Sequence, residues 1–215
     1  MSEQKIEWLK SGDEYAPRPG AFARIVMLDL DCEPPTDIAP NDDDLRDLAR
    51  PGAAPRTYFL RRRLALRAFL GASLGVDPGK VRIAYDVEGA PRVLSHRAFV
   101  SVASRGSIAA LAIASSPVGI DLEPLDVKAP IVREVLHPRE LLALRDEPDH
   151  FLRLWTGKEA CLKAHGAGLV KDPASIEITL EPQRFLARDG QMQFSGEHAI
   201  VELQNAKWLI ACVTL

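Results

Sequence analysis

Two carboxylates stand two residues apart at the end of an apolar segment, VGIDLE, which covers residues 118–123. Side chains of a strand alternate between its faces, so Asp121 and Glu123 should share one face, opposite Ile120 and Leu122. Neighbouring negative charges repel each other, and a hard divalent cation commonly neutralises such a pair. The alternative is two solvated carboxylates at a strand end, because acidic side chains are usually exposed.

A third carboxylate, Glu159, lies in the segment FLRLWTGKEACLKAHGAGL, residues 151–169. At about 100° per residue, this side chain falls on the apolar stripe of a helix. A carboxylate there needs a partner or a function. Lys163, one turn later, offers a routine ion pair as the alternative to a functional role. The stripe is formed by Phe151, Leu152, Trp155 and Leu162.

Arginines are concentrated in the segment TYFLRRRLALRAFLGASLG, residues 57–75. On a helix, Arg63 and Arg67 fall within the apolar stripe, whereas Arg61 and Arg62 fall outside it and are expected at the surface. Arginine suits bidentate pairing with phosphate or carboxylate. Two interpretations stay open for Arg63 and Arg67: contact with an anionic ligand, or ion pairs with structural acids between the two halves of the chain.

These residues need strands and helices to position them. Composition and periodicity indicate an α+β fold, with mostly antiparallel strands. The turn at Ser115-Ser116-Pro117 between two apolar runs resembles a hairpin, and residues 1–20 are expected to be a loose lead-in. Strands are expected at 23–30, 81–85, 99–102, 108–114, 118–122, 175–180, 199–203 and 208–213, and helices at 57–74, 131–135, 138–144 and 149–164.

Composition excludes several classes of protein. The net charge of −3 over 215 residues argues against a dedicated nucleic-acid binder. The sequence shows no membrane-spanning apolar run and no secretory or transit segment. Cys32, Cys161 and Cys212 are far apart and odd in number, and they show neither a metal-ligand spacing nor a disulfide framework, so a reducing, cytoplasmic location is expected. Neither a glycine-rich phosphate loop nor a metal spacing among the histidines is present.

The paired segments resemble the two motifs of 4′-phosphopantetheinyl transferases, in the right order and about 30 residues apart. The most similar class is the larger, Sfp-type one, with two tandem halves in one chain. The resemblance covers about residues 56–180, and it includes the arginine-bearing helix and the turn Gly89-Ala90-Pro91. In the second motif the matching residues are Trp155, Lys158, Glu159, Ala160, Lys163, Gly166, Gly168 and Leu169.

One position departs from the family pattern. The family usually carries a histidine that contacts coenzyme A in the strand before the turn, and here Ser104 stands at that position, followed by Arg105. A serine hydroxyl forms hydrogen bonds but carries no charge. Arg105 would then supply the charge to the phosphate, and the protein could be a specialised or degenerate member.

The resemblance implies a mechanism and a set of site residues. Asp121, Glu123 and Glu159 would bind one Mg²⁺ that also holds the pyrophosphate of coenzyme A. Glu159 would accept the proton of the carrier serine, with Asp121, Glu159 and Lys163 as the catalytic residues. Contacts to coenzyme A would come from Lys158, Lys163, Arg63, Arg67, Ser104 and Arg105.

The resemblance also implies the architecture: two similar α+β halves forming a pseudo-dimer, at residues 1–116 and 117–215, with the active site in the cleft between them. The partners implied are coenzyme A and an apo carrier protein, with neither nucleic acid nor a membrane involved. The enzyme itself is expected to be a monomer. The regions near residues 132–144 and after Gly168 are candidates for carrier docking. Two alternatives remain: a non-catalytic paralogue that binds coenzyme A or a carrier, and an unrelated structural α+β protein.

Overall fold

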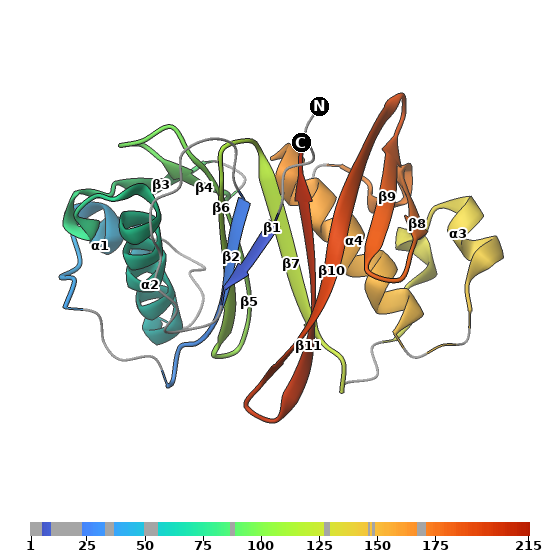
Figure 1. Ribbon diagram of the computed structural model, residues 1–215, viewed down its shortest axis with the longest axis horizontal. Helices are drawn as coiled ribbons and strands as arrows, with labels where there is room; N and C mark the ends of the chain where they lie inside the picture. Colours follow the sequence, from blue (N-terminus) through green and yellow to red (C-terminus); the bar gives the residue numbers. More distant parts are fainter. Residues whose placement is uncertain are drawn as a thin grey trace. The chain divides into compact units, whose positions relative to one another are not determined.

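The computed structural model describes residues 6–9, 23–32, 37–49, 56–86, 89–126, 130–145, 147, 149–166 and 171–215. The chain divides into two compact units, Met1–Ser116 and Pro117–Leu215. Each unit combines a sheet with one long helix, so the α+β class expected from the sequence is confirmed (Figure 1).

The first unit is built on a four-stranded sheet with the order β1-β2-β6-β5. β1 runs parallel to β2, and the β2–β6 and β6–β5 pairs are antiparallel. The seven residues of β2 and of β6 are all buried, which explains their nearly continuous apolar sequences. The strands are β1 (Ile6–Leu9), β2 (Ala23–Asp29), β5 (Phe99–Arg105) and β6 (Ile108–Ala114).

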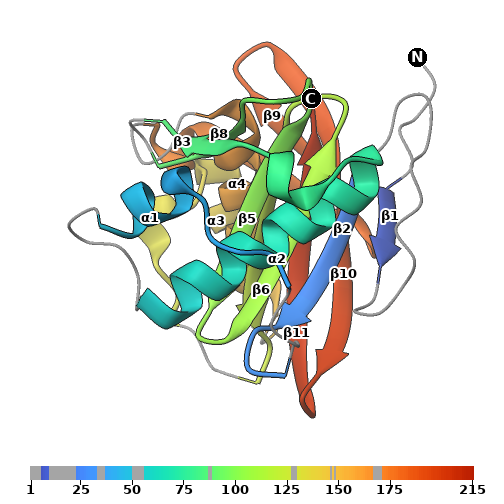
Figure 2. The same ribbon diagram turned by 90° about the vertical axis from the view of Figure 1, so that its left-hand side faces the viewer.

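The helix α2 (Arg56–Leu74) covers one face of this sheet (Figure 2). Its apolar stripe, including Leu66, Phe69 and Leu70, packs with Leu111 of β6 in one buried core. The helix ends at Gly75, whose φ of 69° is readily adopted by glycine. The smaller elements are α1 (Asp42–Leu48), η1 (Pro78–Lys80), β3 (Ile83–Tyr85) and β4 (Pro91–Val93).

The expected hairpin across Ser115-Ser116-Pro117 is wrong. β6 pairs with β2 and β5, whereas the following strand, β7 (Val118–Pro124), pairs with β11 in a different sheet. Two apolar runs around a turn cannot reveal that each has a partner elsewhere in the chain. The true hairpin of this region joins β5 to β6 through Gly106, which has a φ of 58°.

The second unit has a five-stranded antiparallel sheet with the order β7-β11-β10-β9-β8. The turn at Gln204 and Asn205, both with positive φ, joins the two longest strands. The remaining strands of this sheet are β8 (Ile176–Leu180), β9 (Arg184–Asp189), β10 (Met192–Leu203) and β11 (Ala206–Thr214).

The helix α4 (His150–His165) packs against β7 and β11 of this sheet. Gly166, a glycine within the second motif, caps it in the left-handed conformation that glycine readily adopts. His137 caps the short helix α3 (Pro138–Ala143) through a capping box with Glu140. Two single-turn helices complete the unit, η2 (Arg133–Val135) and η4 (Pro173–Ser175).

The expected lead-in is also corrected in part. Ile6–Leu9 forms β1 beside β2, and the other residues up to 20 lie outside the described part of the chain. β9 and the first half of β10 are strands that the sequence pattern did not indicate. No helix among the described residues is long and apolar enough to cross a membrane.

Candidate active site

The strand β7 carries the first pair of candidate carboxylates. Asp121 lies opposite Ala211 of β11 and is 5% exposed, whereas Glu123 lies opposite Leu209 and is half-buried. Because strand side chains alternate, Gly119 shares the face of the two carboxylates. Ile120 and Leu122 point to the opposite face and are buried. The arrangement expected from the spacing of VGIDLE is therefore present.

Gly119 lets the helix α4 approach this face of β7. A Cβ atom built on Gly119 would lie 1.9 Å from the carbonyl oxygen of Ala160 and 2.4 Å from the backbone nitrogen of Ala164. Real Cβ atoms do not approach backbone atoms so closely, so only glycine allows this packing. The close contact places α4 directly beside Asp121.

An ion pair joins the two motifs at this contact. The ammonium group of Lys163 on α4 lies 2.7 Å from Oδ1 of Asp121 on β7. Glu159 lies one helical turn before Lys163, so both side chains belong to one side of α4, and Glu159 is half-buried. The structure thus brings together Asp121 and Lys163, 42 residues apart in sequence. The other two carboxylates lie on the same pair of packed elements, Glu159 on α4 and Glu123 on β7.

The three carboxylates do not form a ready metal site. Within the described ranges, no three residues among His, Cys, Asp and Glu are close enough together to hold a metal ion. The positive charge next to Asp121 is the ammonium group of Lys163. The donor chemistry nevertheless suits a hard cation, since carboxylate oxygens are the protein ligands that Mg²⁺ prefers.

Lys158, which was expected to contact coenzyme A, has its partners within the second unit. Lys158 is fully buried, with its ammonium group 2.9 Å from Glu140 of α3 and 3.0 Å from the carbonyl oxygen of Pro173. It also donates to the carbonyl oxygen of Ile176. Burial lowers the pKa of Lys158, and the negative charge of Glu140 opposes that shift. Three oxygen partners and no exposure leave the group a structural role.

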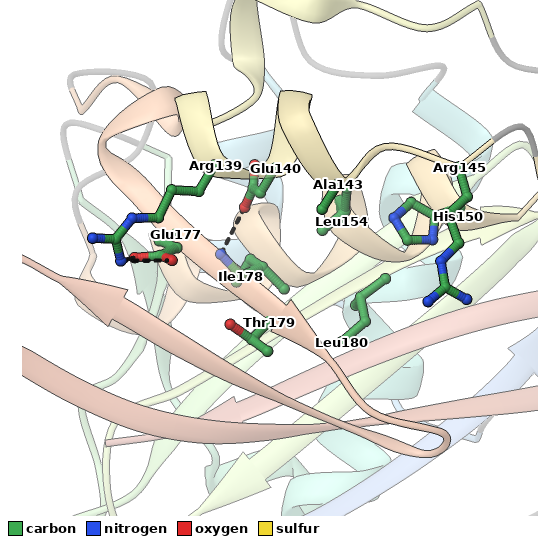
Figure 3. Close-up of a pocket in the computed structure, with 10 residues that line it drawn as sticks. All are labelled: Arg139, Glu140, Ala143, Arg145, His150, Leu154, Glu177, Ile178, Thr179 and Leu180. Carbon is green, nitrogen blue, oxygen red and sulfur yellow. Dashed lines mark hydrogen bonds and ion pairs between the residues drawn. The ribbon is translucent and has the colours of Figure 1, made fainter.

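Glu140, the carboxylate that neutralises Lys158, was not identified from the sequence. Its Oε1 accepts a hydrogen bond of 2.6 Å from the backbone N–H of Ile178 in β8, drawn in Figure 3. Its Oε2 accepts from the backbone N–H of His137 as part of the α3 cap. The capping-box spacing of His137 and Glu140 is a sequence signal that could have identified the cap, but not its contact with Lys158.

A cavity of about 320 Å³ lies beside Glu140, between α3 and β8 (Figure 3). Arg139 at its rim pairs with Glu177, at 3.2 Å to both carboxylate oxygens. The other lining residues are Ala143, Arg145, His150, Leu154, Ile178, Thr179 and Leu180. None of the candidate catalytic residues lines this cavity.

Arg63 and Arg67, for which contact with coenzyme A was one of two interpretations, have partners within the first unit. Both side chains are 1% exposed, and both bind Asp44 of α1, at 2.7 Å and 2.6 Å. Arg63 also binds Asp47 at 3.0 Å. The acids belong to the same unit as the arginines, so the alternative of structural partners is correct, although these partners do not lie between the halves. The sequence gave no sign that Asp44, in the acidic first turn of α1, would be buried.

Ser104 and Arg105 end β5 in the first unit, next to the turn at Gly106. Arg105 is exposed and Ser104 is half-buried. The hydroxyl of Ser104 accepts a hydrogen bond of 2.7 Å from Arg62 of α2. The expectation that Arg62 is a solvated surface residue is therefore corrected, because it lies half-buried against β5.

An apolar cavity of about 250 Å³ adjoins Glu123 in the second unit. Trp155 and Phe151 of α4 form part of its wall, so Glu123 lies at the edge of an apolar surface. The other lining residues are Pro130, Val132, Val135 and Leu152. Two motif residues, Gly168 and Leu169, lie outside the described part of the chain.

Comparison with known proteins agrees with this geometry. Residues 117–213 match the family model of the 4′-phosphopantetheinyl transferase superfamily. The chain is 36% identical over 173 residues to the 4′-phosphopantetheinyl transferase HetI of Nostoc sp., covering 74% of this chain and 71% of that protein. It is 28% identical over 123 residues to the putative 4′-phosphopantetheinyl transferase slr0495 of Synechocystis sp., covering 52% of this chain and half of that protein. With both motifs meeting at the contact of β7 with α4, the chain belongs to the 4′-phosphopantetheinyl transferase superfamily of enzymes.

Proposed function

We propose that this protein transfers the 4′-phosphopantetheine group of coenzyme A to a serine of an apo carrier protein and releases 3′,5′-ADP. The observation that carries the proposal is the pairing of Lys163 with Asp121 where α4 crosses β7 at Gly119. This contact lies within residues 117–213, which match the superfamily. It combines carboxylates with an ammonium group, and phosphoryl transfer needs such charges to position and neutralise phosphate.

Mg²⁺ is part of the proposal. Asp121, Glu123 and Glu159 would hold it, because their carboxylates lie on two elements in direct contact and supply the oxygen ligands that the ion prefers. When bound, the ion would neutralise negative charge on the pyrophosphate.

In this proposal, two residues of the second unit take part in the transfer step. The hydroxyl oxygen of the carrier serine attacks the phosphorus next to pantetheine, and the bond from that phosphorus to the bridging oxygen breaks. 3′,5′-ADP leaves with the electron pair of the broken bond. Glu159 would accept the serine proton, directly or through water. Lys163, whose side chain is 31% exposed, would place its ammonium group against the phosphate oxygens.

The first unit would contribute Ser104 and Arg105 to the binding of coenzyme A. Ser104 offers a hydroxyl, and Arg105 offers an exposed guanidinium group one residue later. Lys158, Arg63 and Arg67 are not part of this proposal, because their charges are buried against carboxylates. The proposal also includes that the two units are related halves of one monomeric enzyme.

The carrier protein would dock near the cavity beside Glu123. The cavity is lined mainly by apolar side chains, and the exposed apolar residue Ile131 lies in sequence between the lining residues Pro130 and Val132. A hydrophobic residue near the carrier serine would bury its side chain there while the serine meets Glu159.

The test is intact-mass spectrometry of apo carrier proteins incubated with the protein, coenzyme A and Mg²⁺. We expect a mass gain of one phosphopantetheine group, which is lost with EDTA. Glu159→Gln should reduce the rate of transfer by at least about 100-fold, because it removes a general base. The variant should keep the wild-type unfolding midpoint, since Glu159 is only half-buried.

Two results would contradict the proposal. Absence of any mass gain across fatty-acid, polyketide and peptide carriers, with coenzyme A still bound, would favour the non-catalytic paralogue. Full activity of Glu159→Gln would remove the role assigned to that carboxylate. Lys171→Gln is a suitable control, because Lys171 pairs with Asp189 of β9 rather than with the candidate carboxylates.

A further inference from the structure

The arginines of α2 differ in what neutralises them. Arg63 and Arg67 are buried against Asp44 and Asp47. Arg61 is half-exposed, and it binds Asp31 at 3.0 Å and the carbonyl oxygen of Leu30 at 2.7 Å. These three guanidinium groups therefore have acidic partners within the first unit.

Arg62 has a different environment. Its Nη1 donates a hydrogen bond of 2.7 Å to Oγ of Ser104, a neutral group. Among the residues that the structure describes, Arg62 forms no ion pair. The side chain is nevertheless half-buried, because it lies on α2 between Phe59 and Leu66, one turn from each, and both are buried. Partial burial without an acidic partner carries a desolvation cost that an anion would offset.

Arg62 and Ser104 together form a set of donors. A guanidinium group has five N–H donors, of which the contact with Ser104 uses one. The hydroxyl of Ser104 accepts from Arg62, so its own hydrogen remains able to donate to a further acceptor. Arg105 adds an exposed positive charge one residue along β5. Such a combination of planar, charged and hydroxyl donors suits a phosphate group.

We propose that Arg62, held by Ser104, binds a phosphate group of coenzyme A. The proposal rests on the function proposed above and assigns a residue to the first unit's share of coenzyme A binding. Ser104 would act by orienting the guanidinium group and by donating its own hydrogen bond. A neutral hydroxyl at this position is then compatible with binding of an anion, because the charge comes from α2.

The test compares two neighbouring arginines by isothermal titration with coenzyme A. Arg62→Gln should weaken binding at least about 10-fold, the effect of losing a charge-assisted contact. Arg61→Gln makes the same change of charge one residue away, and it should stay within about twofold of wild type. Ser104→Ala should give an intermediate loss, because the charge remains but loses its orientation.

3′-Dephospho-coenzyme A distinguishes which phosphate is bound. If Arg62 binds the 3′-phosphate, Arg62→Gln and wild type should bind this analogue equally well. If it binds the pyrophosphate, the variant should be weakened towards both ligands to the same degree. Equal urea midpoints of the Arg61 and Arg62 variants would show that the difference does not arise from unfolding.

The inference is overturned if Arg62→Gln binds coenzyme A as tightly as wild type, or if Arg61→Gln is weakened equally. Failure of the proposed function would be recognised separately. Wild-type protein that binds coenzyme A but modifies no carrier would contradict transfer, while the comparison of the arginine variants would still decide the role of Arg62.

Discussion

Lys158 and Lys163 lie five residues apart on α4, and their ammonium groups have different environments. Lys158 is fully buried and bound to Glu140 and two backbone carbonyl oxygens. Lys163 is partly exposed and bound to Asp121 on β7. A buried charge with three oxygen partners holds elements together, whereas a partly exposed one can exchange its partner for a ligand. Of these two lysines, Lys163 is therefore the one that we propose to meet phosphate.

At the scale of the residue, we predict that Lys158→Met destabilises the protein by about 3 kcal/mol, because it leaves Glu140 buried without its cation. The double variant Lys158→Met/Glu140→Leu should recover part of this loss, since an apolar pair removes the unpaired charge. Urea unfolding at pH 7 measures both differences.

The same double variant tests the role of Lys158 in binding. Its KM for coenzyme A should stay within about twofold of wild type, because the ammonium group of Lys158 is fully buried against Glu140 and two backbone carbonyl oxygens. A rise of tenfold or more in a variant with restored stability would show that Lys158 does contact coenzyme A. Lys163→Met, measured in parallel, should lose transfer while it remains folded.

At the scale of the element, the crossing of α4 and β7 decides which side chains meet. Gly119 removes a Cβ atom from the point of closest approach, where the backbone of Ala160 and Ala164 lies. Asp121 is two residues further along the strand, and Lys163 lies on the turn of the helix that reaches it. The glycine and the acidic residue of the first motif thus act together. Gly119 lets the two elements approach closely, and Asp121 can therefore pair with Lys163 across the contact.

We predict that Gly119→Ala costs about 3 kcal/mol or more and abolishes transfer, because α4 must move away from β7 to accept the methyl group. Gly157→Ala is the matched control. Its Cβ would lie 3.5 Å from Phe185, an ordinary contact, and alanine favours a helix over glycine by about 1 kcal/mol. Equal stability of the two variants would contradict this account of the crossing.

At the scale of the whole molecule, each unit has its own apolar core, and polar groups buried beside these cores make stability depend on pH. His198 of β10 is 8% exposed, and its Nε2 lies 3.0 Å from the carbonyl oxygen of Arg153. Its Nδ1 is buried and has no hydrogen-bond partner among the described residues. Burial, together with the charge of Arg153, lowers the pKa of His198 to about 3.

The sign of the pH dependence follows from this lowered pKa. Above about pH 6.5 the imidazole is neutral in both the folded and unfolded states, so its contribution to stability is fully present. Below that pH the unfolded chain takes up a proton that the folded protein excludes until the pH approaches 3. We predict that His198 alone lowers the free energy of unfolding by up to about 1.4 kcal/mol per pH unit in this window.

Urea unfolding of His198→Gln between pH 7 and 4 measures this contribution as a shallower loss of stability than in wild type. His96→Gln is the control, because the side chain of His96 is only half-buried and its Nδ1 hydrogen-bonds to the hydroxyl of the neighbouring Ser95. A wild-type slope in His198→Gln would show that other groups cause the acid sensitivity.

The sequence determined what local periodicity can determine. The alternation of VGIDLE puts Asp121 and Glu123 on one face of a strand, and the helical repeat puts Glu159 on the half-buried side of α4. Glycines at 75 and 166 end the two long helices where they were expected. These features depend on neighbours a few residues away, which the sequence displays directly.

Only the tertiary structure decided which charges pair. Lys158 meets Glu140 18 residues away, Arg63 meets Asp44 19 residues away, and Arg62 meets Ser104 42 residues away. Strand pairing shows the same limit, since β6 and β7 are adjacent in sequence but belong to different sheets. Periodicity shows that a charged side chain points inward, but the packing of distant elements determines whether it meets a structural partner or remains available to a ligand.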